Sequence, residues 1–288
     1  MLTIQAPAKL NLTLEVLNKR PDGYHEIRSI VQTVSLYDTI EFELSDSIQY
    51  SSDLAEWDAQ KSLVSKAISL LQKTTENKGG ASIRVSKRIP LASGLGGDSS
   101  DAAAILLGIN RLLDLGLSLK KLHSLAEQLG SDVPFFLYGG TALMAGRGEI
   151  ITPLPSLKTI PILLIIPDLP RPARKTEQLY TSLKPQYYTD GKITERLADT
   201  IRQSRTVTSN SLFNVFENIT FAPDSELYKI RAQIMDKGAT NVHLAGSGPA
   251  LFTILESRAE GERLRASLKS PGMSLYVVET VSAPTNQV

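Results

Sequence analysis

The sequence predicts an α+β protein built from two domains. Its 288 residues are enough for two domains that each bury a core. In the first half, strand-like alternation of apolar and polar residues gives way to helical spacing after a glycine-rich loop. The proline-rich stretch from Pro153 to Pro161 precedes a second half whose order of elements approximates a split βαβ, or ferredoxin-like, unit. We therefore predict one domain over residues 1–155 and another over residues 156–288.

The first half opens with an alternating segment, residues 6–17 ("APAKLNLTLEVL"), which has the period of a strand buried on one face. Lys9 and Asn11 lie on its polar face and point the same way, opposite to the expected core. The other elements expected in this half are two strands over residues 27–44 and 81–90, a hairpin over 141–155, and helices over 61–73, 105–113 and 119–129. Ser118 is the expected N-cap of the last helix, and Gly130 its expected end.

The second half mixes apolar runs with helical stripes. Its expected elements are strands over residues 160–166 and 274–281, two strands around residues 244–255, and helices over 174–183, near 211–217, over 225–237 and over 258–268. The polar stretch from Gln186 to Ser209 has no clear period, so no element is assigned to it.

Composition excludes several classes of function. The 31 basic and 30 acidic residues give a net charge of +1 without a basic run, so neither nucleic acid nor an anionic membrane is expected as a partner. The absence of cysteine excludes disulfides, thiolate metal sites and a cysteine nucleophile. The three histidines lie far apart, and no dedicated metal motif is present. The apolar runs are too short for a signal peptide or a membrane span, which favours a cytoplasmic protein. Nothing in the sequence specifies an oligomeric state.

A glycine-rich segment, "GLGGDSSDAAA" (residues 94–104), offers a site for an anion. It follows an expected strand and precedes a helix, so glycines expose backbone N–H groups beside the positive helix end. It is neither a Walker A loop, since no lysine follows, nor a dinucleotide fingerprint, since Ser99 stands where the third glycine would be. The alternative is a flexible loop before a well-capped helix.

Three further residues could act on a phosphoryl group. Asp132, in "GSDVPFF", is either a helix N-cap or a base that accepts a proton from a hydroxyl nucleophile. Lys9 is either a solvated strand residue or a cation that stabilises charge on a transferring phosphoryl group, with Asn11 orienting a substrate oxygen.

Two turns complete the candidate segments. In "KRPDGYHEI" (residues 19–27) a turn presents Tyr24 and His25, which could stack on a base and read its polar edges, or simply begin a half-buried strand. In "LAGSGPALF" (residues 244–252) a second glycine turn either makes a tight hairpin or approaches a ligand phosphate.

Taken together and in order, these segments resemble the GHMP kinase superfamily from Pro7 to about Leu255. The resemblance implies a two-lobed fold, with an N-terminal domain like domain 2 of ribosomal protein S5, a ferredoxin-like C-terminal domain, and ligands in the cleft between them. It also implies an ATP-dependent small-molecule kinase with Mg²⁺ accompanying ATP. The "DGYH" segment is similar to the branch that phosphorylates a cytidyl diphosphate sugar alcohol in non-mevalonate isoprenoid synthesis.

The resemblance also implies roles for individual residues. Asp132 matches the catalytic aspartate and Lys9 the catalytic lysine. The ATP phosphate loop is matched by eleven consecutive residues: Pro90, Leu91, Ala92, Ser93, Gly94, Leu95, Gly96, Gly97, Asp98, Ser99 and Ser100. Contacts with the cytidyl substrate are implied for five residues: Asn11, Tyr24, His25, Thr176 and Tyr180.

Two other functions compete with this one. A homoserine or mevalonate kinase would share the glycine loop, but its substrate carries no base for the "DGYH" segment to stack on. A regulatory module that binds nucleotide without catalysis would not need Lys9 and Asp132.

Asp98 departs from the superfamily's common loop, GLGGGSS, and its charge would repel ATP if it faced the phosphates. One interpretation places Asp98 near the helix N-cap, with Asp101 three residues further in, in an arrangement like a capping box. The other makes Asp98 a partner of magnesium, directly or through water.

Overall fold

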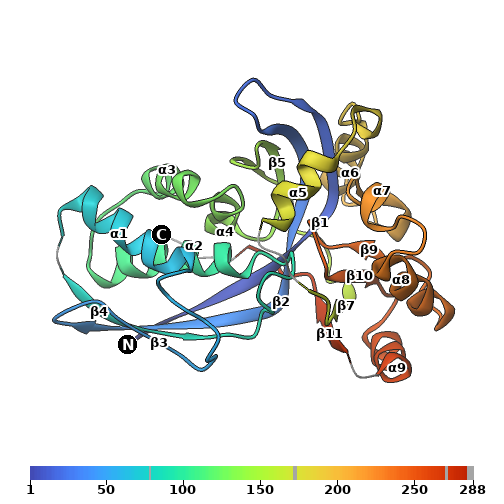
Figure 1. The fold of residues 1–288 in the computed structure, drawn as a ribbon. Helices are drawn as coiled ribbons and strands as arrows, with labels where there is room; N and C mark the ends of the chain where they lie inside the picture. Colours follow the sequence, from blue (N-terminus) through green and yellow to red (C-terminus); the bar gives the residue numbers. More distant parts are fainter. Residues whose placement is uncertain (78, 171–173, 270–271, 284–288) are drawn as a thin grey trace.

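The computed structural model describes residues 1–77, 79–170, 174–269 and 272–283. Within these ranges the chain forms two lobes, each organised around a β-sheet (Figure 1). The first sheet contains β1 (Leu2–Lys19), β2 (His25–Ser45), β3 (Gln49–Ser52), β4 (Gly80–Ser86), β5 (Thr141–Gly146), β6 (Ile150–Pro153) and β8 (Phe213–Asn214). The second contains β7 (Pro161–Pro167), β9 (His243–Leu244), β10 (Leu251–Ile254) and β11 (Met273–Glu279). The α+β prediction is therefore confirmed.

The helices divide between the two lobes. Those over the first sheet are α1 (Leu63–Thr75), α2 (Gly97–Leu112), α3 (Leu119–Leu129) and α4 (Val133–Tyr138). Those that follow β7 are α5 (Lys175–Ser182), α6 (Lys192–Arg202), α7 (Glu217–Thr220), α8 (Glu226–Asp236) and α9 (Arg258–Leu268), with short 3-10 turns at Pro185–Tyr187 and Ser209–Ser211. In Figure 1, α1 to α4 lie on one side of the first sheet, and α7 to α9 border the second.

The first sheet is built on the long antiparallel pair of β1 and β2, and its strands run in the order β3-β4-β2-β1-β8. In the turn between β1 and β2, Arg20 donates its backbone N–H to the Tyr24 carbonyl (2.8 Å), and Gly23, with a φ of +88°, donates its own to the Arg20 carbonyl (3.1 Å). A β-bulge interrupts the β1–β2 register between Asn11 and Thr13. The second sheet is antiparallel, in the order β11-β7-β10-β9.

Strand β1 is buried on both faces, which corrects the expectation of one polar, outward face. Its apolar side chains belong to the core, as predicted. Lys9 and Asn11 do point the same way, but each is only 5% exposed, and Thr13 and Glu15 are fully buried. The polar face is covered because α6 packs against β1, with Thr194 donating its backbone N–H to the Glu15 carboxylate (2.7 Å).

Most predicted elements are confirmed, and two segments differ. Helices α3 and α9 begin and end at the expected residues, and the Ser118 hydroxyl accepts from the backbone N–H of Lys121 as the N-cap of α3. The polar stretch after Gln186 contains a helix, α6, where no element was expected, and its buried residues Leu197, Ala198 and Ile201 follow helical spacing. The helix expected near residues 211–217 is wrong: strand β8 lies there and pairs with β1, and α7 begins only at Glu217.

The two sheets share a hydrophobic core. Ala8 and Leu10 of β1 pack in the same cluster as Ile162 and Leu164 of β7 and Phe252 of β10. Because β8 also crosses back to pair with β1, the chain after residue 156 contributes to both sheets. A domain boundary at residues 155 and 156 stays a prediction.

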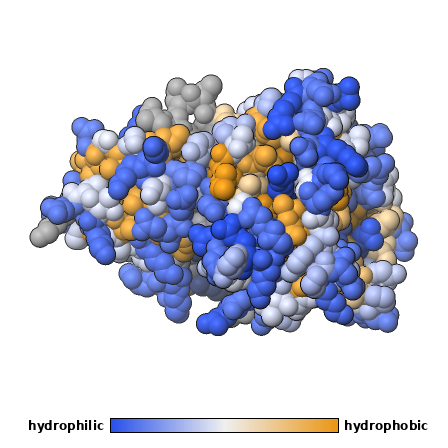
Figure 2. Space-filling view, turned by 90° about the horizontal axis from the view of Figure 1, so that it is seen from above, coloured by the Kyte–Doolittle hydropathy of each residue, from blue (hydrophilic) through white to orange (hydrophobic). Residues whose placement is uncertain are grey.

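The face of the molecule seen from above is mostly hydrophilic (Figure 2). Seen from above, polar side chains cover most of the face, and apolar ones form separate patches among them (Figure 2). None of the helices in the described ranges is long and apolar enough to cross a membrane.

Helix α2 packs on the sheet at Gly108, and a substitution at this position tests that contact. A Cβ atom at this position would lie 2.3 Å from Cζ of Phe42, whose side chain is fully buried. Overpacking costs about 1–3 kcal/mol, more than the ~1 kcal/mol that alanine gains over glycine in a helix. Gly108→Ala is therefore expected to lower the free energy of unfolding in a denaturant titration. Gly130→Ala is the control, because its Cβ would make only ordinary contacts; equal stability of the two variants would contradict this packing.

Candidate active site

A cleft of about 1170 Å³ lies between the two lobes and collects residues from all five candidate segments. The predicted site residues that line it are Lys9, Asn11, Tyr24, His25, Ala92, Gly94, Gly96, Ser99, Asp132, Thr176 and Tyr180. The other predicted loop residues lie outside its lining: Pro90, Leu91, Ser93, Leu95, Gly97, Asp98 and Ser100. Segments more than a hundred residues apart in sequence therefore meet in one cavity.

An ammonium and a carboxylate lie side by side in this cleft. Lys9 Nζ is 3.0 Å from Asp132 Oδ2, and it donates to Asn11 Oδ1 at 2.8 Å. The Lys9 side chain is 6% exposed, whereas that of Asp132 is 35% exposed and accessible to a ligand. A fixed cation beside an accessible carboxylate can stabilise phosphoryl oxygens while the carboxylate accepts a proton.

Asp132 occupies the N-cap position of α4, but its side chain makes no capping hydrogen bond there. Pro134 near the start of this helix removes one of the N–H groups that a cap would satisfy. The carboxylate instead contacts Lys9, so the simple N-cap interpretation is wrong.

The glycine-rich loop packs directly against the second glycine turn. A Cβ atom on Gly94 would lie 2.4 Å from the carbonyl oxygen of Ala245, so no larger residue fits. Ala250 donates its backbone N–H to the Ser93 carbonyl (3.0 Å), and Lys9 donates its own to the Leu95 carbonyl (2.9 Å). These contacts join the loop to both lobes and to the strand that carries Lys9.

Helix α2 begins inside the loop, earlier than expected. Its N-cap is Gly96, with φ of +75°, which offers no side chain to satisfy the N–H groups of the first turn. Gly96 and Ser99 line the cleft. The start of α2 therefore presents backbone donors and a hydroxyl to an anion.

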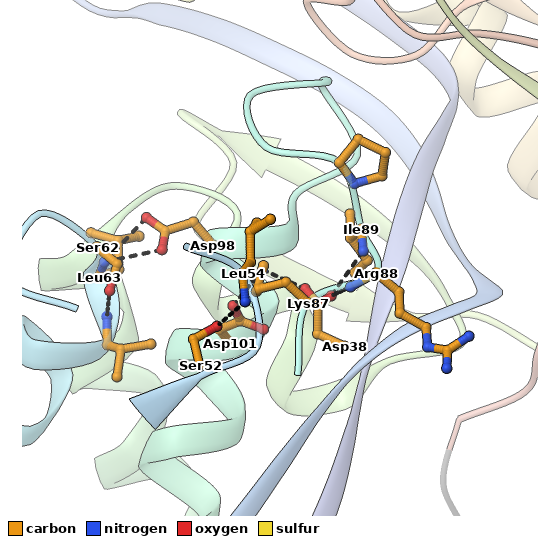
Figure 3. A network of polar contacts seen from close by, with 12 residues as sticks. Asp38, Ser52, Leu54, Ser62, Leu63, Lys87, Arg88, Ile89, Asp98 and Asp101 are labelled. Carbon is orange, nitrogen blue, oxygen red and sulfur yellow. Dashed lines mark hydrogen bonds and ion pairs between the residues drawn. The ribbon is translucent and has the colours of Figure 1, made fainter. Parts of the chain in front are cut away.

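Asp98 points away from this anion site. Both of its carboxylate oxygens accept from the backbone N–H of Leu63, the first residue of α1 (3.1 and 3.2 Å; Figure 3). Asp98 therefore binds the N-terminus of a neighbouring helix, where its charge is favourable. The arrangement like a capping box with Asp101 is wrong, since neither aspartate caps α2.

A buried ion cluster that the sequence did not reveal lies beneath the loop. The Lys87 ammonium contacts Oδ2 of Asp38 (2.5 Å) and Oδ2 of Asp101 (2.6 Å), and these side chains are at most 2% exposed (Figure 3). Asp38 also accepts from the backbone N–H groups of Arg88 and Ile89 (2.5 and 2.8 Å). One ammonium thereby connects the end of β4 with the first turns of α2, on either side of the loop.

The two carboxylates of this cluster are not equivalent. Asp38 receives two backbone hydrogen bonds besides the one from Lys87, whereas Oδ1 of Asp101 is buried without a partner among the described residues. Burial is the main cause that raises the pKa of Asp101 to about 7. The charge of Asp38 raises this pKa further, and the charge of Lys87 lowers it without cancelling the rise. Burial lowers the pKa of Lys87, but Asp101 and Asp38 outweigh this effect and hold it above its ordinary value.

The second glycine turn is held by residues of the second half. The buried Asn214 of β8 donates from Nδ2 to the carbonyls of Leu244 and Gly246 (2.9 and 2.8 Å). Thr176 of α5 shares a hydrogen bond with Ser247 (Oγ1 to Oγ, 2.8 Å). The turn therefore lines the cleft in a defined position beside β1, since a Cβ atom on Gly246 would lie 3.3 Å from Asn11 Oδ1.

Aromatic rings gather at another part of the cleft. The His25 ring stacks on Tyr180 with centroids 5.1 Å apart, and Tyr188 meets His25 edge-on. Burial and the nearby Lys19 lower the pKa of His25, so its imidazole is neutral at pH 7 and has one donor and one acceptor nitrogen. Burial, with a further contribution from Asp132, raises the pKa of Tyr180, which keeps its hydroxyl protonated.

Tyr24 does not join this stack. Its side chain is 54% exposed, and the guanidinium of Arg147 lies 4.6 Å from the ring centroid. Arg147 comes from the β5–β6 turn and, with Lys19, Arg174 and Lys175, lines the cleft with positive charge. Sequence reasoning missed these four residues because they are scattered and no basic run marks them.

Comparison with known proteins agrees with this arrangement. The model of the GHMP kinases N terminal domain matches residues 62–140, and that of the GHMP kinases C terminal domain matches residues 195–272. A 4-diphosphocytidyl-2-C-methyl-D-erythritol kinase from Dehalococcoides mccartyi is 46% identical over 281 residues, which cover 98% of this chain and 99% of that protein. The chain belongs to this kinase family. The predicted GHMP superfamily and kinase chemistry are thereby confirmed.

Solved structures give the same result. The crystal structure of a 4-(cytidine 5'-diphospho)-2C-methyl-D-erythritol kinase matches with a TM-score of 0.82 and 31% identity, over 97% of this chain and 99% of that one. A homoserine kinase from Cytophaga hutchinsonii matches with a TM-score of 0.73 and 19% identity, over 98% and 94% of the chains. The second likeness shows the two-lobed GHMP fold alone.

The ion cluster beneath the family's glycine-rich loop makes stability depend on pH. Between pH 4 and about 7, Asp101 keeps its proton in the folded chain but loses it in the unfolded chain. Since stability falls with rising pH wherever the folded state binds more protons, this contribution is present below pH 4 and lost as pH rises through 7.

Asp101→Asn removes that titration and keeps the shape of the side chain. We expect the wild type to lose on the order of 1–3 kcal/mol of unfolding free energy relative to this variant between pH 4 and 8. Urea titrations at several pH values measure the difference. Asp114→Asn, at an exposed position with a φ of +48° that asparagine accepts, is the control. A constant difference between wild type and Asp101→Asn would contradict the assignment.

Proposed function

We propose that the chain transfers the γ-phosphoryl group of ATP to the 2-hydroxyl of 4-diphosphocytidyl-2-C-methyl-D-erythritol, a step of non-mevalonate isoprenoid synthesis. The observation that carries the proposal is the Lys9–Asp132 pair, 3.0 Å apart, in the same cleft as a glycine-rich helix start and a set of aromatic rings. The pair supplies the chemistry, the helix start suits the phosphates of ATP, and the rings suit a pyrimidine base.

In the proposed step, the substrate oxygen forms a bond to the γ-phosphorus as the bond to the β,γ-bridging oxygen breaks. The hydroxyl proton passes to the Asp132 carboxylate, and ADP leaves with the bridging oxygen. The Lys9 ammonium is held by Asn11 and Asp132, so it can face the phosphoryl oxygens without reorganising. Positioning and electrostatics supply most of the rate in such a transfer.

The loop contributes the phosphate site. Gly96 and Ser99 at the start of α2 line the cleft, which supports phosphate binding there. The Asp98 carboxylate binds the first N–H group of α1, so its charge does not oppose ATP. We therefore do not assign Asp98 to magnesium.

Mg²⁺ is part of the proposal. No group of three or more histidines, acids or cysteines suited to a metal occurs in the part of the chain that the structure describes. Ser99 and Asp132 nevertheless place hard oxygen donors in the cleft, which suits an ion that keeps its waters and the phosphates as its other ligands. When bound, it neutralises charge on the phosphates.

The cytidyl end of the substrate is assigned to the aromatic part of the cleft. Neutral His25 can donate to and accept from the edge of a cytosine, and Tyr180 offers a ring face. Tyr24, Thr176 and Asn11 line the same space. Arg147, above Tyr24, adds a cation that suits a diphosphate. In this proposal residues 1–155 and 156–288 form the two lobes of a cytoplasmic enzyme whose partners are small molecules.

Substrate choice tests the proposal directly. The purified protein is given ATP with 4-diphosphocytidyl-2-C-methyl-D-erythritol, homoserine or mevalonate, and ADP release and phosphorylated product are measured. Only the cytidyl substrate is expected to be phosphorylated, because the other alcohols carry no base for His25 and Tyr180. Turnover of either rival instead would reassign the substrate, and nucleotide binding without turnover of any alcohol would favour a regulatory module.

Asp132→Asn tests the base. The amide keeps the size of the side chain but cannot take the hydroxyl proton, so kcat is expected to fall by about 10²–10⁴-fold. ATP affinity, measured by calorimetry, is expected to change little, because the phosphate site lies on the loop. Glu177→Gln, which neutralises another acid of the cleft, is the control. Near-normal turnover by Asp132→Asn would remove this residue from the mechanism.

A further inference from the structure

A chain of buried hydrogen bonds leads from the catalytic lysine to a serine behind it. Lys9 Nζ donates to Asn11 Oδ1 (2.8 Å), and Asn11 Nδ2 donates to Ser29 Oγ (2.8 Å). Ser29 Oγ in turn donates to the Thr13 carbonyl (2.5 Å). Ser29 is fully buried on β2 and lies outside the lining of the cleft.

In this series of hydrogen bonds, the chemistry of each group decides which one donates and which one accepts. A backbone carbonyl can only accept, so the Ser29 hydroxyl must give its hydrogen to Thr13. Its lone pairs then face Asn11 and require the NH₂ end of that amide. The carbonyl end is thereby turned toward Lys9, whose ammonium can only donate.

The backbone places Ser29 for this task. The β-bulge between Asn11 and Thr13 shifts the register of β1 against β2 at this point. Thr13 is fixed independently, because its hydroxyl accepts from the N–H of Ile30 (2.9 Å) and from Thr194 of α6 (2.9 Å). The carbonyl that receives the Ser29 hydrogen is therefore held by two strands and a helix.

We propose that Ser29 is a positioning residue: it fixes the Asn11 amide with its oxygen toward Lys9 and so holds the ammonium beside Asp132. This inference rests on the proposed function, since it concerns the same pair of groups. Without the hydroxyl, Asn11 Nδ2 loses its buried acceptor, and only the contact with Lys9 still holds the amide. The side chain can then rotate to find another acceptor for its NH₂ group, and this movement takes the amide oxygen, with the ammonium bound to it, away from its place beside Asp132.

The test compares Ser29→Ala with Ser29→Thr, which keeps a hydroxyl and suits a strand because it is β-branched. With ATP and 4-diphosphocytidyl-2-C-methyl-D-erythritol, Ser29→Ala is expected to lower kcat by about tenfold, with KM for ATP within about twofold of wild type. Ser29→Thr is expected to retain most of kcat. Ser65→Ala, at another buried serine, is the control. Unchanged kcat in Ser29→Ala, or equal losses in Ser29→Ala and Ser29→Thr, would overturn the proposal.

A double-mutant cycle separates positioning from a general loss of packing. If Ser29 acts through Asn11, then adding Ser29→Ala to Asn11→Ala costs no further activity, whereas independent effects multiply. Multiplying losses would overturn the inference.

A crystal structure of Ser29→Ala gives a readout that does not need turnover. The Asn11 side chain is expected in a changed rotamer or in two rotamers, with Lys9 Nζ displaced from Asp132. An unchanged Lys9–Asn11–Asp132 arrangement would overturn the inference even if the wild type failed to phosphorylate the cytidyl substrate. That failure by itself would overturn only the proposed function.

Discussion

The geometry of the proposed phosphate site depends on one buried ammonium group, that of Lys87. It lies between Asp38 and Asp101, so strand β2 and the first turns of α2 are held to the residue that follows β4. Charges attract strongly where water is excluded, but two carboxylates around one ammonium leave an excess negative charge. Hydrogen bonds from the chain at Arg88 and Ile89 stabilise Asp38, which leaves Asp101 as the group that takes up a proton. The chain on both sides of residues 90–100 is thus held by side chains that lie outside this range.

A loop that is fixed at both ends also fixes the position of the residues that pack against it. Gly94 lies against the second glycine turn so closely that a Cβ atom would overlap the backbone, and the Leu95 carbonyl binds the backbone of Lys9. The loop therefore fixes the backbone position of Lys9 and contacts the C-terminal lobe at the cleft. The close contact at Gly94 also explains why the loop needs glycine for its packing.

Periodicity and turn chemistry predicted α3 and α9, each of which begins after a serine that caps the helix with its hydroxyl, whereas α6 begins after Gly191 without a side-chain cap. They failed for α6, which lies in the polar stretch after Gln186, and for β8, whose two residues pair with β1 across two hundred positions of sequence. The predicted cleft residues came from local motifs and from resemblance. Lys87, Asp38, Ser29 and Arg147 were not found, since each is an ordinary residue type whose importance arises only from what the fold brings beside it.

The same limit explains why Lys9 and Asn11 were expected to face outward. Alternating apolar and polar residues look identical whether the polar face meets water or a polar cleft, because the pattern records only which residues avoid the core. What distinguishes the two cases is whether the polar groups find partners from other elements. Asn11 donates a hydrogen bond to Ser29, Thr13 accepts one from Thr194, and the Glu15 carboxylate accepts one from the backbone at the start of α6. A polar face can be buried only when its groups are hydrogen-bonded, so the residues that bind the polar side chains of β1 also orient Lys9 and Asn11 in the cleft.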